Sequence, residues 1–290
     1  MNRRRFLALS AAFACAPRLA SAHTWQGRAL GAEVSVTLTG PRAMAESALA
    51  AIPPLLEAIE AQFSLYREGS ALNELNAAGR LVRPGAMMRA LLAEAGRAHA
   101  LTGGLFDPTV QPLWQALAMG ADPAPARAAI GWHRVTATAE AVTLAPGQAL
   151  TLNGIAQGYA TDLVRDLLAA HGATRALVDI GEFAALGGPF SLGVEDPAQG
   201  LVATRRLSDG AIATSSPGAL SLGASGHILA PDGRAPLWST VSVEARSATL
   251  ADALSTAAVF LDRGRLETLK DSANVARITA VAPDGRLITV

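Results

Sequence analysis

Helical and strand-like patterns are grouped along this chain instead of alternating, and this grouping is what most constrains its fold. Apolar residues at helical spacing occupy 44–63, 87–101 and 154–171, whereas 176–244 contains one short strand pattern after another. A doubly wound sheet needs a regular succession of strand and helix, which this sequence lacks. The grouping therefore predicts an α+β fold with a mostly antiparallel sheet and packed helices. No stretch resembles a linker, which predicts a single domain.

Turn and cap residues set the expected boundaries of these elements. Pro53 and Pro54 must kink or split the helix 44–63, and Asn153 is the expected N-cap of the helix that begins at Gly154. The Ala- and Pro-rich stretch 121–128 fits either a surface connection or a short helix. Strands are expected at 34–38, 176–180, 190–194, 202–207, 227–230 and 240–244, with hairpins at 135–144 and 276–290 and further helices at 250–261 and 265–270.

The first 22 residues have the features of a cleaved export signal. An arginine pair precedes Phe6-Leu7, an apolar stretch follows, and small residues end it at Ala22. The arginines favour the twin-arginine route and a periplasmic location for the mature domain, 23–290. A buried helix with a basic start is the alternative. A lipid anchor at Cys15 is less favoured, because residues 12–14 lack the usual upstream leucine.

Two residue counts exclude several classes of chemistry. Lys270 is the only lysine and lies in neither a Gly-Lys-Ser/Thr nor a Ser-x-x-Lys context, which excludes a P-loop and a Ser-Lys acyl-enzyme. Cys15 is the only cysteine, so cysteine zinc sites, disulfides and thiol catalysis are excluded as well. Lys and Arg together number 24, as do Asp and Glu, which argues against nucleic acid as a partner. Loss of the signal removes four arginines and leaves a mildly acidic chain.

Three stretches carry residue patterns that suit a nucleotide and a cation. A glycine pair before Phe106-Asp107 allows close backbone approach, and the small residues of 152–160 open a helix whose amides could hold a phosphate. Asp252 and Thr256 lie four residues apart on one helical face, where a carboxylate and a hydroxyl suit a hard cation such as Mg²⁺. Each stretch also has a purely structural interpretation, with the glycines and Asp252 as helix caps and Thr256 as core filler.

Taken together, these segments resemble the ApbE family of FAD:protein FMN transferases. Residues 104–113, GLFDPTVQPL, resemble its Gly-x-Phe-Asp-x-Thr-Val-x-Pro-Leu motif, and 151–162, TLNGIAQGYATD, resemble Asp-Leu-Gly-Gly-Ile-Ala-Lys-Gly-Tyr-Ala-x-Asp. Residues 251–256, ADALST, are identical to a further motif. The remaining similar blocks are FSLY with SALNELN at 63–76, AIATSS at 211–216 and GHILAPDG at 226–233. Six blocks in the family's order cover most of the mature chain.

The resemblance implies an exported, Mg²⁺-dependent enzyme that cleaves FAD, releases AMP and joins FMN to a Thr or Ser hydroxyl of an acceptor flavoprotein. It implies that Asp252, Thr256 and the carbonyl of Gly154 hold the metal, and that His227 helps to deprotonate the acceptor hydroxyl. A histidine at that position could instead be structural. The positions that match FAD contacts of the family are Leu30, Tyr66, Leu105, Phe106, Asp107, Thr151, Gln157 and Ile228.

The sequence departs from the family pattern at the nucleotide end. Thr151 stands where the family usually has Asp, Gln157 where it usually has Lys, and Ala230 where the His block has Asp. Glu182 adds bulk and charge where a Gly-Gly-Asp/Asn motif is expected. Gln157 can donate a hydrogen bond but cannot neutralise a phosphate.

These departures leave three functions open. The first is a divergent transferase, similar to the branch associated with nitrous oxide reductase maturation, whose acceptor is a membrane-bound electron-transfer subunit. The second is a non-catalytic protein that binds or delivers FAD. The third is an FAD diphosphatase without a protein acceptor, which would need the same metal site.

Overall fold

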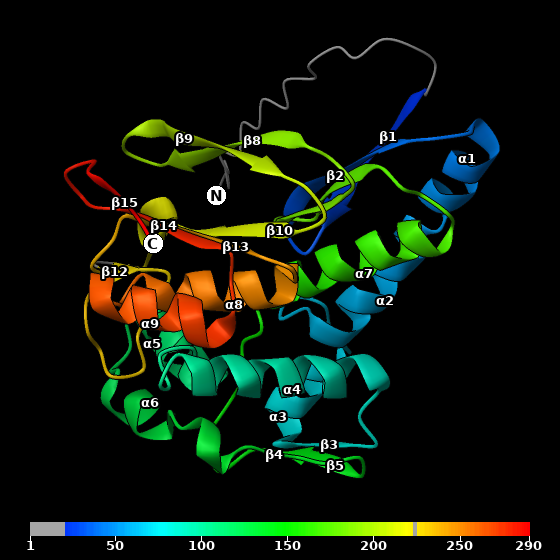
Figure 1. Cartoon of the computed structure of the whole chain (residues 1–290). Coiled ribbons are helices and arrows are strands. Elements are labelled where there is room, and N and C mark those ends of the chain that lie inside the picture. The colour runs from blue at the N-terminus through cyan, green and yellow to red at the C-terminus, as the bar shows by residue number, and fades with distance from the viewer. Residues whose placement is uncertain (1–20, 223–224) are drawn as a thin grey trace.

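The structure, a computed structural model, describes residues 21–222 and 225–290. The export signal predicted at 1–22 thus lies almost wholly outside the described residues. The architecture is α+β, as the sequence predicts, with an antiparallel sheet above a helical layer (Figure 1). No helix in the described part of the chain is both long enough and apolar enough to cross a membrane.

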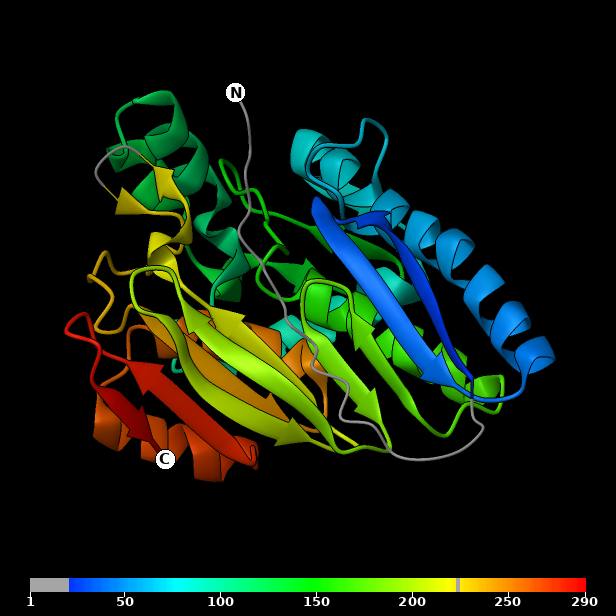
Figure 2. The same cartoon turned by 90° about the horizontal axis from the view of Figure 1, so that it is seen from above.

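One eight-stranded sheet organises the molecule. All of its neighbouring strands pair antiparallel, three of the pairs being hairpins of consecutive strands and the rest joining strands that are separated by other elements. In spatial order its strands are β1 (Ala22–Ala29), β2 (Ala32–Thr39), β6 (Ala176–Asp179), β7 (Phe183–Leu186), β10 (Ala211–Ser215), β13 (Thr240–Ala245), β14 (Arg277–Val281) and β15 (Leu287–Thr289). Figure 2 shows this sheet from above, with β1 and the C-terminal strands at opposite edges.

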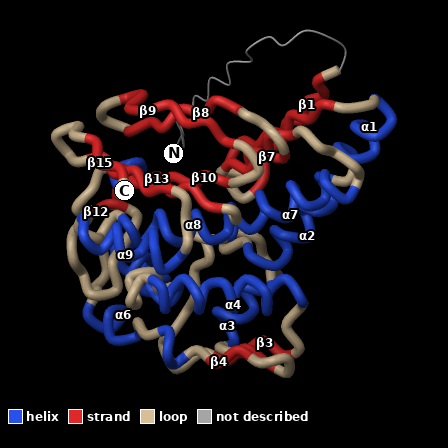
Figure 3. Tube along the Cα trace, viewed as in Figure 1, coloured by secondary structure: helices blue, strands red, loops and turns tan. Residues whose placement is uncertain are grey.

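The two faces of the sheet are covered differently. Helices α7 (Ala156–Ala170) and α8 (Ala248–Ala258) pack on one face, and Figure 3 shows most of the helices below the strands of the large sheet. Over the other face folds the hairpin of β8 (Phe190–Asp196) and β9 (Gly200–Leu207), which encloses a small apolar cluster that includes Leu192, Val194 and Ile212. Burial of apolar residues on both faces makes the centre of the sheet part of the core.

The remaining helices are α1 (Arg42–Ala50), α2 (Ile52–Phe63), α3 (Ala71–Ala78), α4 (Ala86–Leu101), α5 (Gln111–Met119), α6 (Ala124–Ala129) and α9 (Arg263–Ala273). Of these, α1, α2 and α9 also contact strands of the large sheet, whereas α4 lies below α8 and packs against it (Figure 1). The helix expected at 44–63 is split at Ala51, because Pro53 occupies the first turn of α2, where its missing N–H costs nothing. A small sheet of β3 (Arg80–Val82), β5 (Ala141–Thr143) and β4 (Thr136–Ala137) contains the expected hairpin.

Two local expectations are wrong. Asn153 is not the cap of α7: the cap position is Ile155, without a side-chain hydrogen bond, and the helix begins at Ala156. Residues 227–230 do not form a strand. The short pair of β11 (Ser221–Leu222) and β12 (Ser225–Gly226) ends before them, and a turn then follows in which the Gly233 N–H donates to the Ala230 carbonyl.

Candidate active site

Close packing of α7 on α8 brings together the three residues predicted to hold a cation. The Gly158 N–H donates to Asp252 Oδ2 at 2.9 Å, and a Cβ on Gly158 would lie 2.3 Å from the Ala248 carbonyl oxygen. One turn earlier, a Cβ on Gly154 would lie 2.9 Å from Thr256 Oγ1. Only glycine permits this approach, so the spacing of two glycines matches the spacing of Asp252 and Thr256.

The sequence left open whether Asp252 is merely a helix cap, and its position in α8 excludes that role. Ser247 is the N-cap, with its Oγ accepting from the Leu250 N–H, and Asp252 lies beyond the first turn. The sequence also led us to expect that backbone N–H groups at the start of α7 are free to bind a phosphate, and three of these N–H groups already have acceptors within the protein. The Ile155 and Ala156 N–H groups donate to the Leu152 carbonyl, and the Gly158 N–H donates to Asp252.

Three carboxyl groups lie in this region, and burial makes each of them harder to ionise. Burial raises the pKa of Asp252 to about 7, against the opposing effect of the Gly158 N–H, and raises that of Asp179 to about 6. Burial, followed by the negative charges of Asp252 and Asp179, raises the pKa of Glu182 well above its usual value. Burial therefore opposes the charge that the sequence led us to expect on Glu182.

Hydroxyl groups complete the polar surroundings of Asp252. Ser215 Oγ, at the end of β10, lies 2.8 Å from Ser255 Oγ and 3.4 Å from Thr256 Oγ1. Within the described residues no group of three or more His, Cys, Asp or Glu side chains is arranged to hold a metal. The donor set nevertheless fits a hard cation: a buried carboxylate with one oxygen lacking a hydrogen bond, a hydroxyl, and glycine backbone that approaches both.

The predicted flavin-binding block at 104–113 lies against the segment that precedes α7. The Thr151 N–H donates to the Pro108 carbonyl at 2.9 Å, which joins two of the resembling motifs. Asp107 is buried and saturated: its Oδ1 accepts from the N–H and Oγ1 of Thr109 at 2.8 and 2.6 Å, and its Oδ2 from the Trp132 N–H at 3.3 Å. Asp107 therefore shapes this loop, whose Leu105 and Phe106 side chains are themselves buried.

The other predicted flavin contacts come from separate parts of the chain. Leu30 adopts φ +49° in the β1–β2 turn, where its N–H donates to Glu60 Oε1 at 2.7 Å. Tyr66, in the loop after α2, is 68% exposed. Gln157 lies against Gly181, since a Cβ on that glycine would come within 2.7 Å of the Gln157 amide.

The predicted general base lies beyond the same end of β10 as the cation residues. His227 Nδ1 is 3.2 Å from the Pro217 carbonyl, and its N–H donates to the Leu220 carbonyl. Pro217 is only two residues from Ser215, which contacts Thr256. The half-buried Ile228 packs against the main core.

Sequence reasoning missed the setting of Glu182. Its Oε2 accepts from the Thr214 N–H at 3.0 Å, and its carbonyl accepts from Thr161 Oγ1 at 3.2 Å. Thr161 is one turn from Gly158, the residue that contacts Asp252, so both acidic residues lie against the same face of α7. The only sequence signal was the departure from glycine at this position. The site as a whole offers hard oxygen ligands next to an aromatic-lined loop, which suits a diphosphate ester held through a cation.

Comparison with known proteins places this arrangement among proteins of one family. The ApbE family matches residues 30–279. A search of proteins with curated function finds no significant match. The fold is similar to the flavin transferase ApbE of Vibrio cholerae (TM-score 0.79, 23% identity, covering 94% of this chain and 97% of that one). It is also similar to the flavinyl transferase ApbE of Pseudomonas stutzeri (0.80, 25%, 93% and 94%) and the ApbE protein of Thermotoga maritima (0.82, 25%, 92% and 96%).

Proposed function

Since the chain belongs to the ApbE family, we propose that it is a flavin transferase that moves FMN from FAD to a Thr or Ser hydroxyl of an acceptor flavoprotein and releases AMP. The observation that carries this proposal is the α7–α8 contact. It places Asp252 and Thr256 against Gly158 and Gly154, in the arrangement that the family resemblance implies for Mg²⁺. Bound Mg²⁺ would neutralise charge on the diphosphate oxygens as the phosphoryl group is transferred.

The residues of this chain divide the remaining tasks. Asp252 and Thr256 present oxygen ligands from a rigid helix, and Tyr66 with the loop 104–107 would cover the flavin. We propose that His227 accepts the proton of the acceptor hydroxyl, which requires a base within hydrogen-bond reach. The position of His227 supports this role, because its ring contacts the Pro217 carbonyl, two residues beyond Ser215, whose hydroxyl contacts Thr256.

The nucleotide end supports a divergent variant of the same reaction. The Gln157 amide, in place of lysine, can orient an oxygen without neutralising it, and Thr151 replaces a carboxylate. Membership in the branch associated with nitrous oxide reductase, with a membrane-bound acceptor subunit, stays a prediction.

Mass spectrometry tests the reaction directly. The protein is incubated with FAD, Mg²⁺ and a candidate acceptor domain, and the acceptor should gain the mass of FMN while AMP appears. AMP without acceptor modification would instead indicate an FAD diphosphatase. Binding of FAD with neither product would contradict the transferase proposal and favour FAD delivery.

We also propose that the protein is exported to the periplasm after cleavage behind Ala22. The position of β1 supports this, because cleavage there removes only the first residue of the strand and the Ala22–Thr39 pair. The mature protein purified from the periplasm should begin at His23 on N-terminal sequencing. A lipid-modified Cys15 would contradict the assignment.

A further inference from the structure

Glu182 is more than nine-tenths buried, yet only one of its two carboxylate oxygens accepts a hydrogen bond from the described residues. The Thr214 N–H donates to Oε2, whereas Oε1 accepts no hydrogen bond within the described residues. This oxygen is not fully enclosed by the described residues, so a ligand from outside the fold can reach it. The single hydrogen bond at Oε2 could equally be made by a neutral glutamine amide.

Glu182 also differs from other acidic residues of low exposure in the groups that surround its charge. Other acidic groups of low exposure have either an arginine partner or several donors: Asp162 lies 2.9 Å from Arg165 and Glu244 3.3 Å from Arg205, while Asp107 accepts three hydrogen bonds. No ion pair in the described part of the chain involves Glu182 or Asp252. The side chain that contacts the neighbouring Gly181 is the neutral Gln157. Glu182 and Asp252 are therefore neighbouring carboxyl groups, and neither forms an ion pair with a cationic side chain of the described residues.

The positions of the two groups are set by the same helix. Asp252 reaches α7 at Gly158, and the Glu182 backbone reaches α7 at Thr161, one turn further on. Thr214, which donates to Glu182, directly precedes Ser215, whose hydroxyl contacts Thr256. Glu182 thus lies at the edge of the donor set formed by Asp252 and Thr256.

We propose that Glu182 is a second carboxylate ligand of the cation that Asp252 and Thr256 hold. The inference rests on the proposed function for the presence of that cation. A divalent ion would compensate both buried charges, as buried carboxylates require. A second carboxylate also raises affinity for a hard divalent cation, because affinity rises with ligand charge. This chain would then bind Mg²⁺ with two carboxylates at a site for which the family motif supplies one.

Manganese binding to the purified full chain tests this assignment without measuring activity. Chelator-treated protein is titrated with Mn²⁺, with and without FAD, and free Mn²⁺ is followed by electron paramagnetic resonance. Glu182→Gln keeps the acceptor for Thr214 and removes the charge, and we expect its Mn²⁺ affinity to fall about 10–100-fold. The Mn²⁺ affinity of Asp252→Asn should fall by at least the same factor. Glu195→Gln, on the exposed surface of β8, is the matched control and should bind as the parent does.

The outcomes separate this inference from the proposed reaction. Equal Mn²⁺ affinity of Glu182→Gln and the parent, with Asp252→Asn weakened, would overturn the role of Glu182 and leave the transferase proposal intact. Reduced affinity in a protein that never modifies an acceptor would support Glu182 and contradict the reaction. Absence of Mn²⁺ binding by the parent would overturn both the metal assignment and this inference. Should Glu182→Gln not fold, Glu182→Asp, which keeps the charge, must bind Mn²⁺ more tightly than Glu182→Gly.

Discussion

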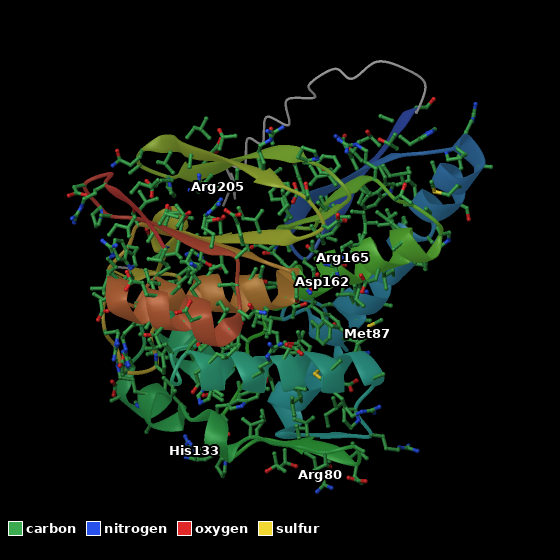
Figure 4. The ribbon with its side chains drawn as sticks, in the orientation of Figure 1. Arg80, Met87, His133, Asp162, Arg165 and Arg205 are labelled. Carbon is green, nitrogen blue, oxygen red and sulfur yellow. The ribbon has the colours of Figure 1, made fainter. Side chains whose placement is uncertain are left out.

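The α7–α8 helix pair contains two buried aspartates whose surroundings are opposite. Asp162, on α7, accepts from the Ser247 hydroxyl, the Ala248 and Thr249 N–H groups and the Thr249 hydroxyl, and pairs with Arg165 (Figure 4). Among the residues that the structure describes, the carboxylate of Asp252, on α8, accepts only from the Gly158 N–H, and burial raises its pKa. The first carboxylate is saturated by the fold, and the second is left with capacity for a ligand.

The contrast shows how stability and function are divided within one contact. Asp162 caps the start of α8 with donors from three consecutive residues and thereby fixes the register of the two helices. That fixed register is what brings Asp252 and Thr256 opposite Gly158 and Gly154. Asp252 itself is a destabilising feature of the protein without its cation, because a buried carboxylate with one donor is poorly solvated.

Removal of Asp162 should have the largest effect on folding. Asp162→Ala leaves the Ala248 and Thr249 N–H groups and Arg165 without their acceptor, which should lower the free energy of unfolding by about 3–5 kcal/mol. Urea denaturation followed by circular dichroism measures the change. Asp166→Asn, which removes the more exposed partner of the same arginine, is the control and should change stability by less than about 0.5 kcal/mol. Similar losses in the two variants would mean that Asp162 is not the main link between the helices.

Asp252→Asn should affect activity and leave folding intact. The amide can still accept from the Gly158 N–H but offers no charge to a cation, so we expect FMN transfer to fall about 10³-fold, or about 4 kcal/mol. The free energy of unfolding in chelator should be unchanged or higher. Initial rates of AMP release and urea melts on the same preparation give both values. If Asp252→Asn lost as much stability as Asp162→Ala, then Asp252 would stabilise the fold as Asp162 does, and the contrast between the two aspartates would be wrong.

Asp179 extends the comparison to pH. Its folded-state pKa of about 6 exceeds the usual value of 3.8, so the folded protein binds the proton more tightly than the unfolded chain. Stability that this proton provides is full below about pH 4 and is lost as pH rises through 6. Asp179→Asn has no carboxyl group to ionise here, so its free energy of unfolding should not fall in this way as pH rises. It should exceed that of the parent by about 2–3 kcal/mol at pH 8 and equal it at pH 4. A pH-independent difference between the melts would contradict the assignment to ionisation.

Much of the fold and part of the site could be predicted from the sequence, for identifiable reasons. The four-residue spacing of Asp252 and Thr256 depends only on helix geometry, and the glycines of α7 revealed the close approach. Strands β1 and β10 were missed because an exposed edge strand and an Ala-rich strand lack the usual alternation. The roles of Asp162 and Glu182 depend on contacts with segments more than 30 residues away, and no local pattern encodes them.

Gln157→Lys should have the smallest effect, and it tests whether the missing lysine explains the uncompensated charges. Gln157 lies against Gly181, and Gly181 lies between Asp179 and Glu182 in the sequence. The ammonium of a lysine at position 157 would therefore be close to both carboxylates. We expect FAD to bind up to about 10-fold more tightly, because 1.4 kcal/mol is a common size for one added ion pair near a phosphate. Mn²⁺ affinity should fall a few-fold, since the ammonium competes with the cation for Glu182. Gln157→Met, similar in length and uncharged, is the control for side-chain shape. If Mn²⁺ binds equally well to the lysine and methionine variants, then the lysine does not reach Glu182, and the acidic character of this site has not arisen from the loss of a lysine at position 157.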